Sequence, residues 1–126
     1  MGKGTLKTNG VHLLDHEYAT VKVFLEEGFD IELIPPVRIK DVRTPDFTMN
    51  GISWEMKSPE GGGKTTIRHT IKHAVTQSGN LIIDLRRCKV DDKTAIKELE
   101  LHFKLSKRIR RMKIVTKDLK ILDYSK

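Results

Sequence analysis

The chain has 126 residues, a length typical of one domain with a modest core of its own. Its formal net charge of +7 favours polyanionic partners such as nucleic acid, while 37% hydrophobic and 33% charged residues do not match a disordered chain. The single cysteine, Cys88, excludes an internal disulfide, and without a run of about 18 apolar residues there is no membrane-spanning segment.

The first ten residues, MGKGTLKTNG, are basic and rich in glycine, and they lack the apolar stretch of a signal peptide. They predict a flexible basic arm, 1–10, in front of a single domain, 11–126. A start of this kind also suits a chain cut from a longer protein.

An amphipathic helix is predicted over residues 13–27, ended by Gly28. The buried stripe expected from i, i+4, i+7 and i+11 spacing is Leu14, Tyr18, Val21 and Leu25. The apolar run 29–36 then predicts a strand, closed by two prolines that cannot continue a ladder. Residues 37–44 predict a loop leading into the next strand.

Two short strands are predicted around Asn50-Gly51, the dipeptide most favoured in two-residue hairpin turns. A second helix follows over residues 65–78. Its predicted inward face is Ile67, Ile71, Ala74 and Ser78. The short apolar run 80–85 suits a central strand covered on both faces.

A third helix is predicted to start at Asp91 or Asp92, whose carboxylates can cap it, and to run to about Lys107. Its predicted inward residues are Ile96, Leu99 and Phe103. Residues 113–126 predict two last short strands or a hairpin. The order α-β-β-β-α-β-α-β(-β) indicates the α/β class, with a mixed central sheet flanked by helices.

The Asn50-Gly51 turn fixes the register of the hairpin and places Asp46 directly opposite Glu55. Alternation gives an apolar face of Phe47, Met49, Ile52, Trp54 and Met56. The other face carries Asp46, Thr48, Ser53, Glu55 and Lys57. Opposed side chains lie roughly 4.5–5.5 Å apart at Cβ, where two like charges destabilise the pair.

A divalent cation between Asp46 and Glu55 would reverse that repulsion, and oxygen ligands suit Mg²⁺ or Mn²⁺. Lys57 points to the same face, where it can orient an attacking water or stabilise charge on a phosphate. The alternative is a solvent-exposed polar face on which Lys57 only neutralises its neighbours.

Pro45-Asp46 and Glu55-Met56-Lys57, separated by a hairpin, resemble the PD-(D/E)XK signature of the restriction-endonuclease-like nuclease superfamily. The string TPDFTMNGISWEMKSP resembles the nuclease domain at the C-terminus of CdiA-type contact-dependent growth-inhibition toxins, a resemblance that covers about 13–85. It implies a restriction-endonuclease-like α-β-β-β-α-β core with an extra C-terminal helix and strands. It also implies a metal-dependent nuclease, often cutting tRNA, that a cognate immunity protein holds inactive.

The resemblance implies two further site residues. Such folds often carry a glutamate on the first helix near the metal, and Glu17 occupies that place at the border of the apolar stripe. They often carry a glutamine on the second helix, where Gln77 borders the apolar face. A solvated helix glutamate and an ordinary boundary residue are the respective alternatives.

The GGGKTT segment does not match a phosphate-binding loop, because G-x-x-x-x-G-K-[ST] requires glycine where Ser58 stands. It predicts a mobile loop beside the site, with Lys64 available to a phosphate backbone. Ser58, Lys64, Arg43 in the preceding loop and Arg68 on the second helix are the predicted substrate contacts, together with Gln77.

Two histidine pairs, His12 with His16 and His69 with His73, are spaced four residues apart, but neither has an evident third zinc ligand. They are interpreted as solvated, with the second pair on the polar side of its helix, where it can meet nucleic acid. The basic segment 104–113 suits either a helix C-terminus or a phosphate-contacting surface.

We therefore predict a metal-dependent endonuclease in which Asp46 and Glu55 hold Mg²⁺ or Mn²⁺, with Glu17 bound directly or through water, and Lys57 assists catalysis. The resemblance favours tRNA over DNA and implies a toxin that acts in the cytoplasm of a target cell, delivered as part of a larger secreted or surface protein. Alternatives are a PD-(D/E)XK DNA endonuclease and a non-catalytic nucleic-acid- or partner-binding domain. An antitoxin-like protein is disfavoured because such partners of nucleases are usually acidic.

Overall fold

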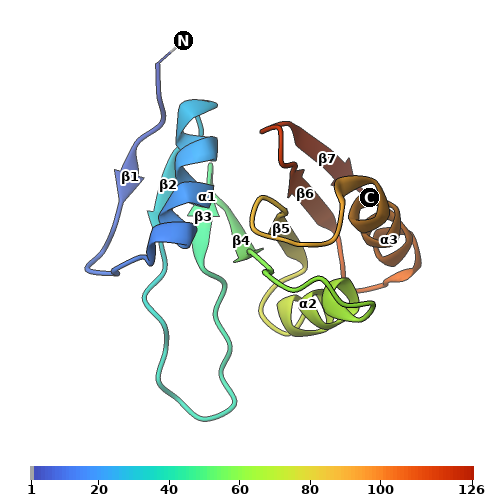
Figure 1. Cartoon of the computed structure of the whole chain (residues 1–126). Coiled ribbons are helices and arrows are strands. Elements are labelled where there is room, and N and C mark those ends of the chain that lie inside the picture. The colour runs from blue at the N-terminus through green and yellow to red at the C-terminus, as the bar shows by residue number, and fades with distance from the viewer. Residues whose placement is uncertain (1) are drawn as a thin grey trace.

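A seven-stranded mixed sheet organises the chain, and three helices cover its faces (Figure 1). The computed structural model describes residues 2–126. Its elements are β1 (Leu6–Lys7), α1 (Asp15–Glu26), β2 (Ile31–Leu33), β3 (Phe47–Met49), β4 (Ile52–Lys57), α2 (Thr66–Ala74), β5 (Asn80–Asp84), α3 (Asp92–Leu105), β6 (Arg111–Val115) and β7 (Ile121–Ser125). The predicted mixed α/β class with a final hairpin is confirmed.

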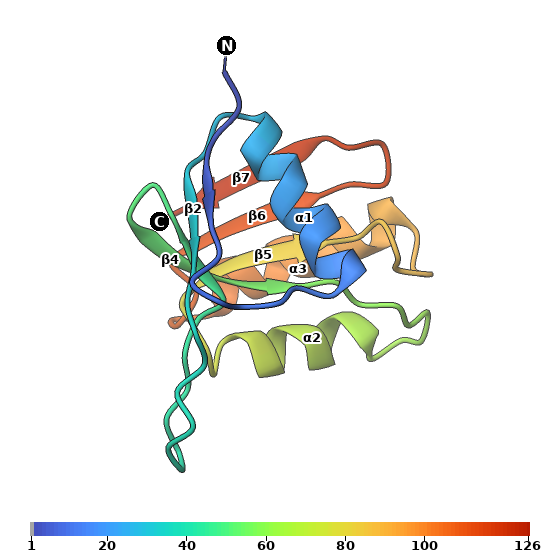
Figure 2. The ribbon, with the colours of Figure 1, turned by 90° about the vertical axis from the view of Figure 1, so that its left-hand side faces the viewer.

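The strands lie in the sheet in the same order as in the chain, β1 to β7. β1–β2, β4–β5 and β5–β6 are parallel pairs, and the remaining neighbours are antiparallel. The parallel pairs β4–β5 and β5–β6 are joined through α2 and α3, which places both helices on one face of the sheet. α1 covers the other face, as Figure 2 shows.

β5 is the central strand that the sequence predicted. Leu81 and Ile83 point into the core beneath α2 and α3, whereas Ile82 packs with the residues beneath α1. All three side chains are fully buried. An apolar run without alternation is therefore explained by helices on both faces of a parallel strand.

The predicted hairpin register is confirmed. Phe47 pairs with Trp54, and Asn50 and Gly51 have φ values of 49° and 85°. Positive φ at both central residues is the requirement of a type I′ turn, which an asparagine followed by glycine meets at low cost. The ladder ends at the Phe47–Trp54 pair, so Asp46 lies just before β3.

The predicted stripe of the first helix is wrong at Leu14 and Tyr18, which are 62% and 47% exposed. The buried residues of α1 are Thr20, Val21 and Phe24. Thr20 was not among the predicted inward residues, but its hydroxyl donates a hydrogen bond to the buried carboxylate of Asp84 on β5. At the other end, Gly28 terminates the helix as expected, with φ of 93°.

Part of the segment expected to be a flexible arm belongs to the sheet, since Leu6 and Lys7 form β1 alongside β2. Gly4 makes this possible, because a Cβ at that position would lie 1.7 Å from the carbonyl oxygen of Phe29. Met1 of the predicted arm lies outside the described residues.

Both later helices end sooner than predicted. α2 ends at Ala74, which leaves Gln77 in the turn after it, and α3 ends at Leu105. Asp91 caps α3 as predicted, its carboxylate accepting a hydrogen bond from the backbone of Thr94 at 3.1 Å. Across residues 2–126, the helices are too short or too polar to cross a membrane.

Candidate active site

A pocket of about 340 Å³ opens at the end of the β3–β4 hairpin that lies away from the Asn50-Gly51 turn, next to the first turn of α1. Residues of the 34–46 loop form one wall of this pocket. Five of the predicted catalytic, metal-binding and substrate-binding residues line it: Glu17, Arg43, Asp46, Glu55 and Gln77. They come from α1, the loop, β4 and the turn after α2, so the fold brings together residues far apart in the chain.

Asp46 is held by β4 through both its backbone and its side chain. Its N–H donates to the carbonyl of Trp54 at 3.0 Å, and its carboxylate accepts from the N–H of Met56 at 2.9 Å. The carboxylate thus replaces a backbone carbonyl as the acceptor for Met56. The ladder therefore does not continue to the expected Asp46–Glu55 pair. The side chain is fixed at the mouth of the hairpin beside Glu55.

Glu55 is buried, with 4% of its surface exposed, which contradicts the alternative of a solvent-exposed polar face. The β4–β5 register places Glu55 opposite Leu81, so its side chain points to the face of the sheet that α2 and α3 cover. One carboxylate oxygen lies 3.1 Å from Nζ of Lys57. The other, Oε1, is buried and has no hydrogen-bond partner within residues 2–126.

Burial and the neighbouring charge of Asp46 raise the pKa of Glu55 to about 8, against the opposing effect of Lys57. Burial also raises the pKa of Asp46, although the hydrogen bond from Met56 acts in the other direction. Lys57 favours the charged form of both acids, but its effect does not outweigh burial at either one. The alternative of a solvent-exposed polar face therefore does not hold for Glu55.

Lys57 and Glu17 border a second cavity of about 250 Å³, together with Ser58 and His16. Lys57 is one-third exposed, so its ammonium contacts both Glu55 and the solvent in this cavity. Glu17 lines both cavities, but its carboxylate accepts a hydrogen bond at 2.8 Å from the N–H of Leu14 and so caps its own helix. Residues 2–126 contain no cluster of three or more acidic, histidine or cysteine side chains placed to share a metal ion.

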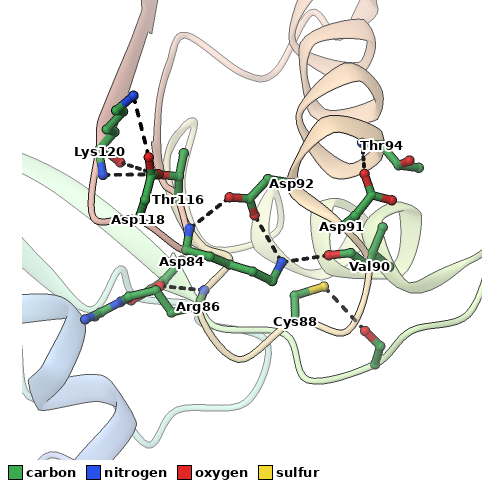
Figure 3. A network of polar contacts seen from close by, with 12 residues as sticks. Asp84, Arg86, Cys88, Val90, Asp91, Asp92, Thr94, Thr116, Asp118 and Lys120 are labelled. Atoms are coloured by element: carbon green, nitrogen blue, oxygen red, sulfur yellow. Dashed lines mark hydrogen bonds and ion pairs between the residues drawn. The ribbon is translucent and has the colours of Figure 1, made fainter.

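A second buried acid, Asp84 at the end of β5, holds α1 on the sheet, and Figure 3 shows its contact with Arg86. It accepts hydrogen bonds from the hydroxyl of Thr20 at 2.6 Å and from Nη2 of Arg86 at 2.7 Å. Arg86 also donates to the carbonyl of Ala19 at 2.9 Å. Burial acts to raise the pKa of Asp84, but the bonds from Arg86 and Thr20 outweigh it and lower the pKa. Sequence reasoning missed this group, whose signal is an aspartate closing an otherwise apolar central strand.

The next residue along the chain, Arg87, fixes the end of β4. One guanidinium nitrogen donates to the carbonyl of Ser58 at 3.0 Å, and another lies 2.7 Å from Glu60. Cys88 donates to the carbonyl of Gly61 at 3.4 Å, a contact drawn in Figure 3. The first part of the glycine segment is therefore tied to the loop after β5, which the sequence did not indicate.

The remaining predicted substrate contacts differ in position. Ser58 lies at the end of β4 and lines the cavity next to Lys57. Lys64 and Arg68 are exposed on the segment before α2 and on α2 itself, and neither lines the cavities around the carboxylates. The fold thus brings Arg43 and Gln77 to the carboxylates, Ser58 to Lys57, and the other two cations to the periphery.

A family model described as the contact-dependent growth inhibition CdiA C-terminal domain matches residues 43–121, more than half of the chain. The matched region contains Asp46, Glu55 and Lys57 but not Glu17. No curated protein matches the sequence. Among solved structures, the CdiA-CT/CdiI toxin and immunity complex from Burkholderia pseudomallei is similar, with a TM-score of 0.74 and 17% identity over 98% of this chain and 100% of that one. At that identity the likeness shows the fold.

Proposed function

The chain belongs to the contact-dependent growth inhibition CdiA C-terminal domain family, and from that premise we propose that this toxin domain is a metal-dependent nuclease of the PD-(D/E)XK type. Asp46 and Glu55 hold the metal and Lys57 assists catalysis. The site of action is the cytoplasm of a target cell, reached as part of a larger secreted or surface protein.

The observation that carries this proposal is the buried Oε1 of Glu55, which has no partner within residues 2–126 although Asp46 lies beside it. A buried carboxylate oxygen without a hydrogen-bond partner is costly, and most buried polar atoms in native proteins are paired. Mg²⁺ and Mn²⁺ accept such oxygens, and Mg²⁺ is commonly held by one or two carboxylates with water and substrate phosphate completing its shell. Two carboxylates therefore suffice, and the residues present fit the ion.

When bound, the cation lowers the pKa of a coordinated water and offsets charge on the phosphate. The hydrogen bond from Met56 orients the carboxylate of Asp46 toward Glu55. Lys57 extends past Glu55 into the adjoining cavity, where its ammonium can orient water or contact a phosphate oxygen. Glu17, which caps α1, reaches the ion through water.

For the substrate we propose tRNA in preference to DNA, because the resemblance is to CdiA-type nuclease domains that often cut tRNA. Arg43 and Gln77 would contact it within the carboxylate pocket, and Ser58 beside Lys57. Lys64 and Arg68 would contact phosphates farther out. We also propose a cognate immunity protein as partner, since the similar fold was solved in a toxin and immunity complex.

Cleavage of total tRNA and of duplex DNA, each with Mg²⁺, Mn²⁺ or EDTA, tests the proposal. We expect metal-dependent cutting that is lost in Glu55→Gln and Lys57→Ala and retained in the control variants Glu98→Gln and Lys97→Ala on α3. Cutting of DNA alone would favour the DNA endonuclease. Intact substrates in every lane, with nucleic acid still bound, would establish a non-catalytic binding domain instead.

A further inference from the structure

A third cavity continues the candidate active site toward α2. The carboxylate pocket and the Lys57 cavity share Glu17, and the Lys57 cavity shares Lys57 and Ser58 with a further cavity of about 280 Å³. This third cavity is closed on its far side by His69, Thr70 and His73. The three cavities therefore follow one another along the surface, from the 34–46 loop past the carboxylates to the exposed side of α2.

The chemical character of this path changes along its length. The carboxylate pocket is lined by three acids, whereas the cavity at α2 is lined by Lys57, Ser58, Pro59, His69, Thr70 and His73, none of which is acidic. Its polar side chains are an ammonium, two hydroxyls and two imidazoles, which together offer several hydrogen-bond donors. A surface of this composition fits a ligand that carries negative charge and accepts hydrogen bonds.

Histidines are concentrated along the path. His12 lines the carboxylate pocket, His16 the Lys57 cavity, and His69 and His73 the cavity at α2, which makes four of the five in the chain. His69 and His73 are one helical turn apart, so both imidazoles stand on one side of α2. The sequence already placed the second pair where it can meet nucleic acid, but it did not indicate that all four histidines lie along one path.

We propose that His69 and His73, with Lys57 and Ser58, form a subsite that binds a phosphodiester of the nucleic acid next to the one positioned at the carboxylates. This inference rests on the nuclease function proposed above. It assigns a path to the bound strand, from the 34–46 loop across the end of β4 and along α2. Arg68 and Lys72, exposed on the same helix, supply further cations that can contact the strand along α2.

The double variant His69→Ala/His73→Ala tests the subsite by fluorescence anisotropy with labelled tRNA and with labelled duplex DNA. The measurement is made in EDTA, because the subsite lies outside the carboxylate pair and its contribution does not require the metal. We expect Kd to rise about tenfold for the substrate that is cleaved, the loss appropriate to two donors to phosphate. His102→Ala, which removes the fifth histidine on α3, should leave Kd unchanged.

Two further measurements separate binding from other roles. In Mg²⁺ the double variant should raise KM about tenfold with kcat within about twofold of the wild type, since a neighbouring phosphate contact contributes to uniform binding. His69→Lys/His73→Lys should restore affinity by supplying cationic donors, and His69→Glu/His73→Glu should weaken it further. Both positions are exposed, so all these variants are expected to fold.

An unchanged Kd and KM in the double-alanine variant, or wild-type protein that binds neither nucleic acid in EDTA, overturns the subsite. Loss of affinity in a protein that never cleaves would leave the subsite standing and overturn the nuclease. Cleavage by the wild type, together with unchanged affinity in the double-alanine variant, would support the nuclease and overturn the subsite.

Discussion

Glu55 on β4 and Asp84 on β5 are both buried carboxylates on adjacent strands, yet their surroundings are opposite. Asp84 is surrounded by donors from Thr20 and Arg86, and its pKa is lowered. Among residues 2–126, Glu55 forms one ion pair, with Lys57, and its pKa is raised to about 8. The fold meets the hydrogen-bonding needs of the acid that fixes α1 and leaves incomplete those of the acid that faces the pocket. The contrast supports the proposed division between Asp84 as a structural acid and Glu55 as a functional one.

The largest expected effect is on catalysis. Glu55→Gln keeps the shape of the side chain but removes the charge that attracts the metal, so we expect the rate of cleavage to fall on the order of 10³-fold. Gel-based cleavage assays at saturating Mg²⁺ measure the fall. Asp84→Asn is the opposing variant. If it lowered kcat as much as Glu55→Gln while the protein stayed folded, the division of roles between the two acids would be wrong.

The next effect is on stability. Asp84→Ala leaves Arg86 without its buried partner and removes the bond to Thr20, so we expect the free energy of unfolding to fall by roughly 2–4 kcal/mol. Urea denaturation of the metal-free protein measures the change. Asp123→Ala removes an exposed carboxylate that pairs with Lys113 and should cost less than about 1 kcal/mol. Equal losses in both variants would contradict a special role for Asp84.

A smaller effect of opposite sign is expected for Glu55→Gln on stability. Between about pH 4.5 and pH 8 the folded protein holds a proton on Glu55 that the unfolded chain has released, because folding raises the pKa from 4.5 to about 8. Wild-type stability in EDTA therefore falls as the pH rises from about 4.5 to about 8, a slope that the variant lacks. At pH 8 the variant should be more stable by roughly 1–3 kcal/mol, and the difference should vanish near pH 4.5.

Urea unfolding across this pH range provides the measurement, with Glu98→Gln on α3 as the control. A wild type that is as stable as Glu55→Gln at pH 8 would show that burying the charge of Glu55 does not lower the free energy of unfolding. Addition of Mg²⁺ should narrow the gap by stabilising only the wild type.

The smallest effect is expected at the outer limit of the functional region. Lys64→Ala should weaken tRNA binding by no more than about threefold, because its side chain is exposed and outside the carboxylate pocket. Arg43→Ala, within that pocket, should weaken binding more strongly. Anisotropy titrations at several salt concentrations compare the two. A larger loss at Lys64 would extend the substrate path toward the glycine segment.

Local sequence signals predicted much of the frame. The Asn50-Gly51 turn, the cap at Asp91 and the apolar run of β5 each depend on neighbouring residues, and each is confirmed. The same signals placed Asp46 beside Glu55. Their roles in metal binding stay predictions.

What the sequence did not predict depends on residues far apart in the chain. Glu55 is buried because α2 and α3 cover the face of the sheet to which it points, and no residue of the hairpin specifies that cover. Thr20 faces inward because of Asp84, which lies 64 positions later. The cap formed by Glu17 was missed for another reason, because Leu14 at the start of α1 is not a residue that signals a capping box.

The strand order described above bears on how quickly the domain acquires its structure. Each strand pairs with the strand before and after it in the chain, so no strand has to be inserted between two that have already paired. The entropy lost on closing each loop is then kept small, and topologies of this kind fold faster than those that join distant segments. With this strand order the toxin domain can build its sheet strand by strand, without waiting for its two ends to meet.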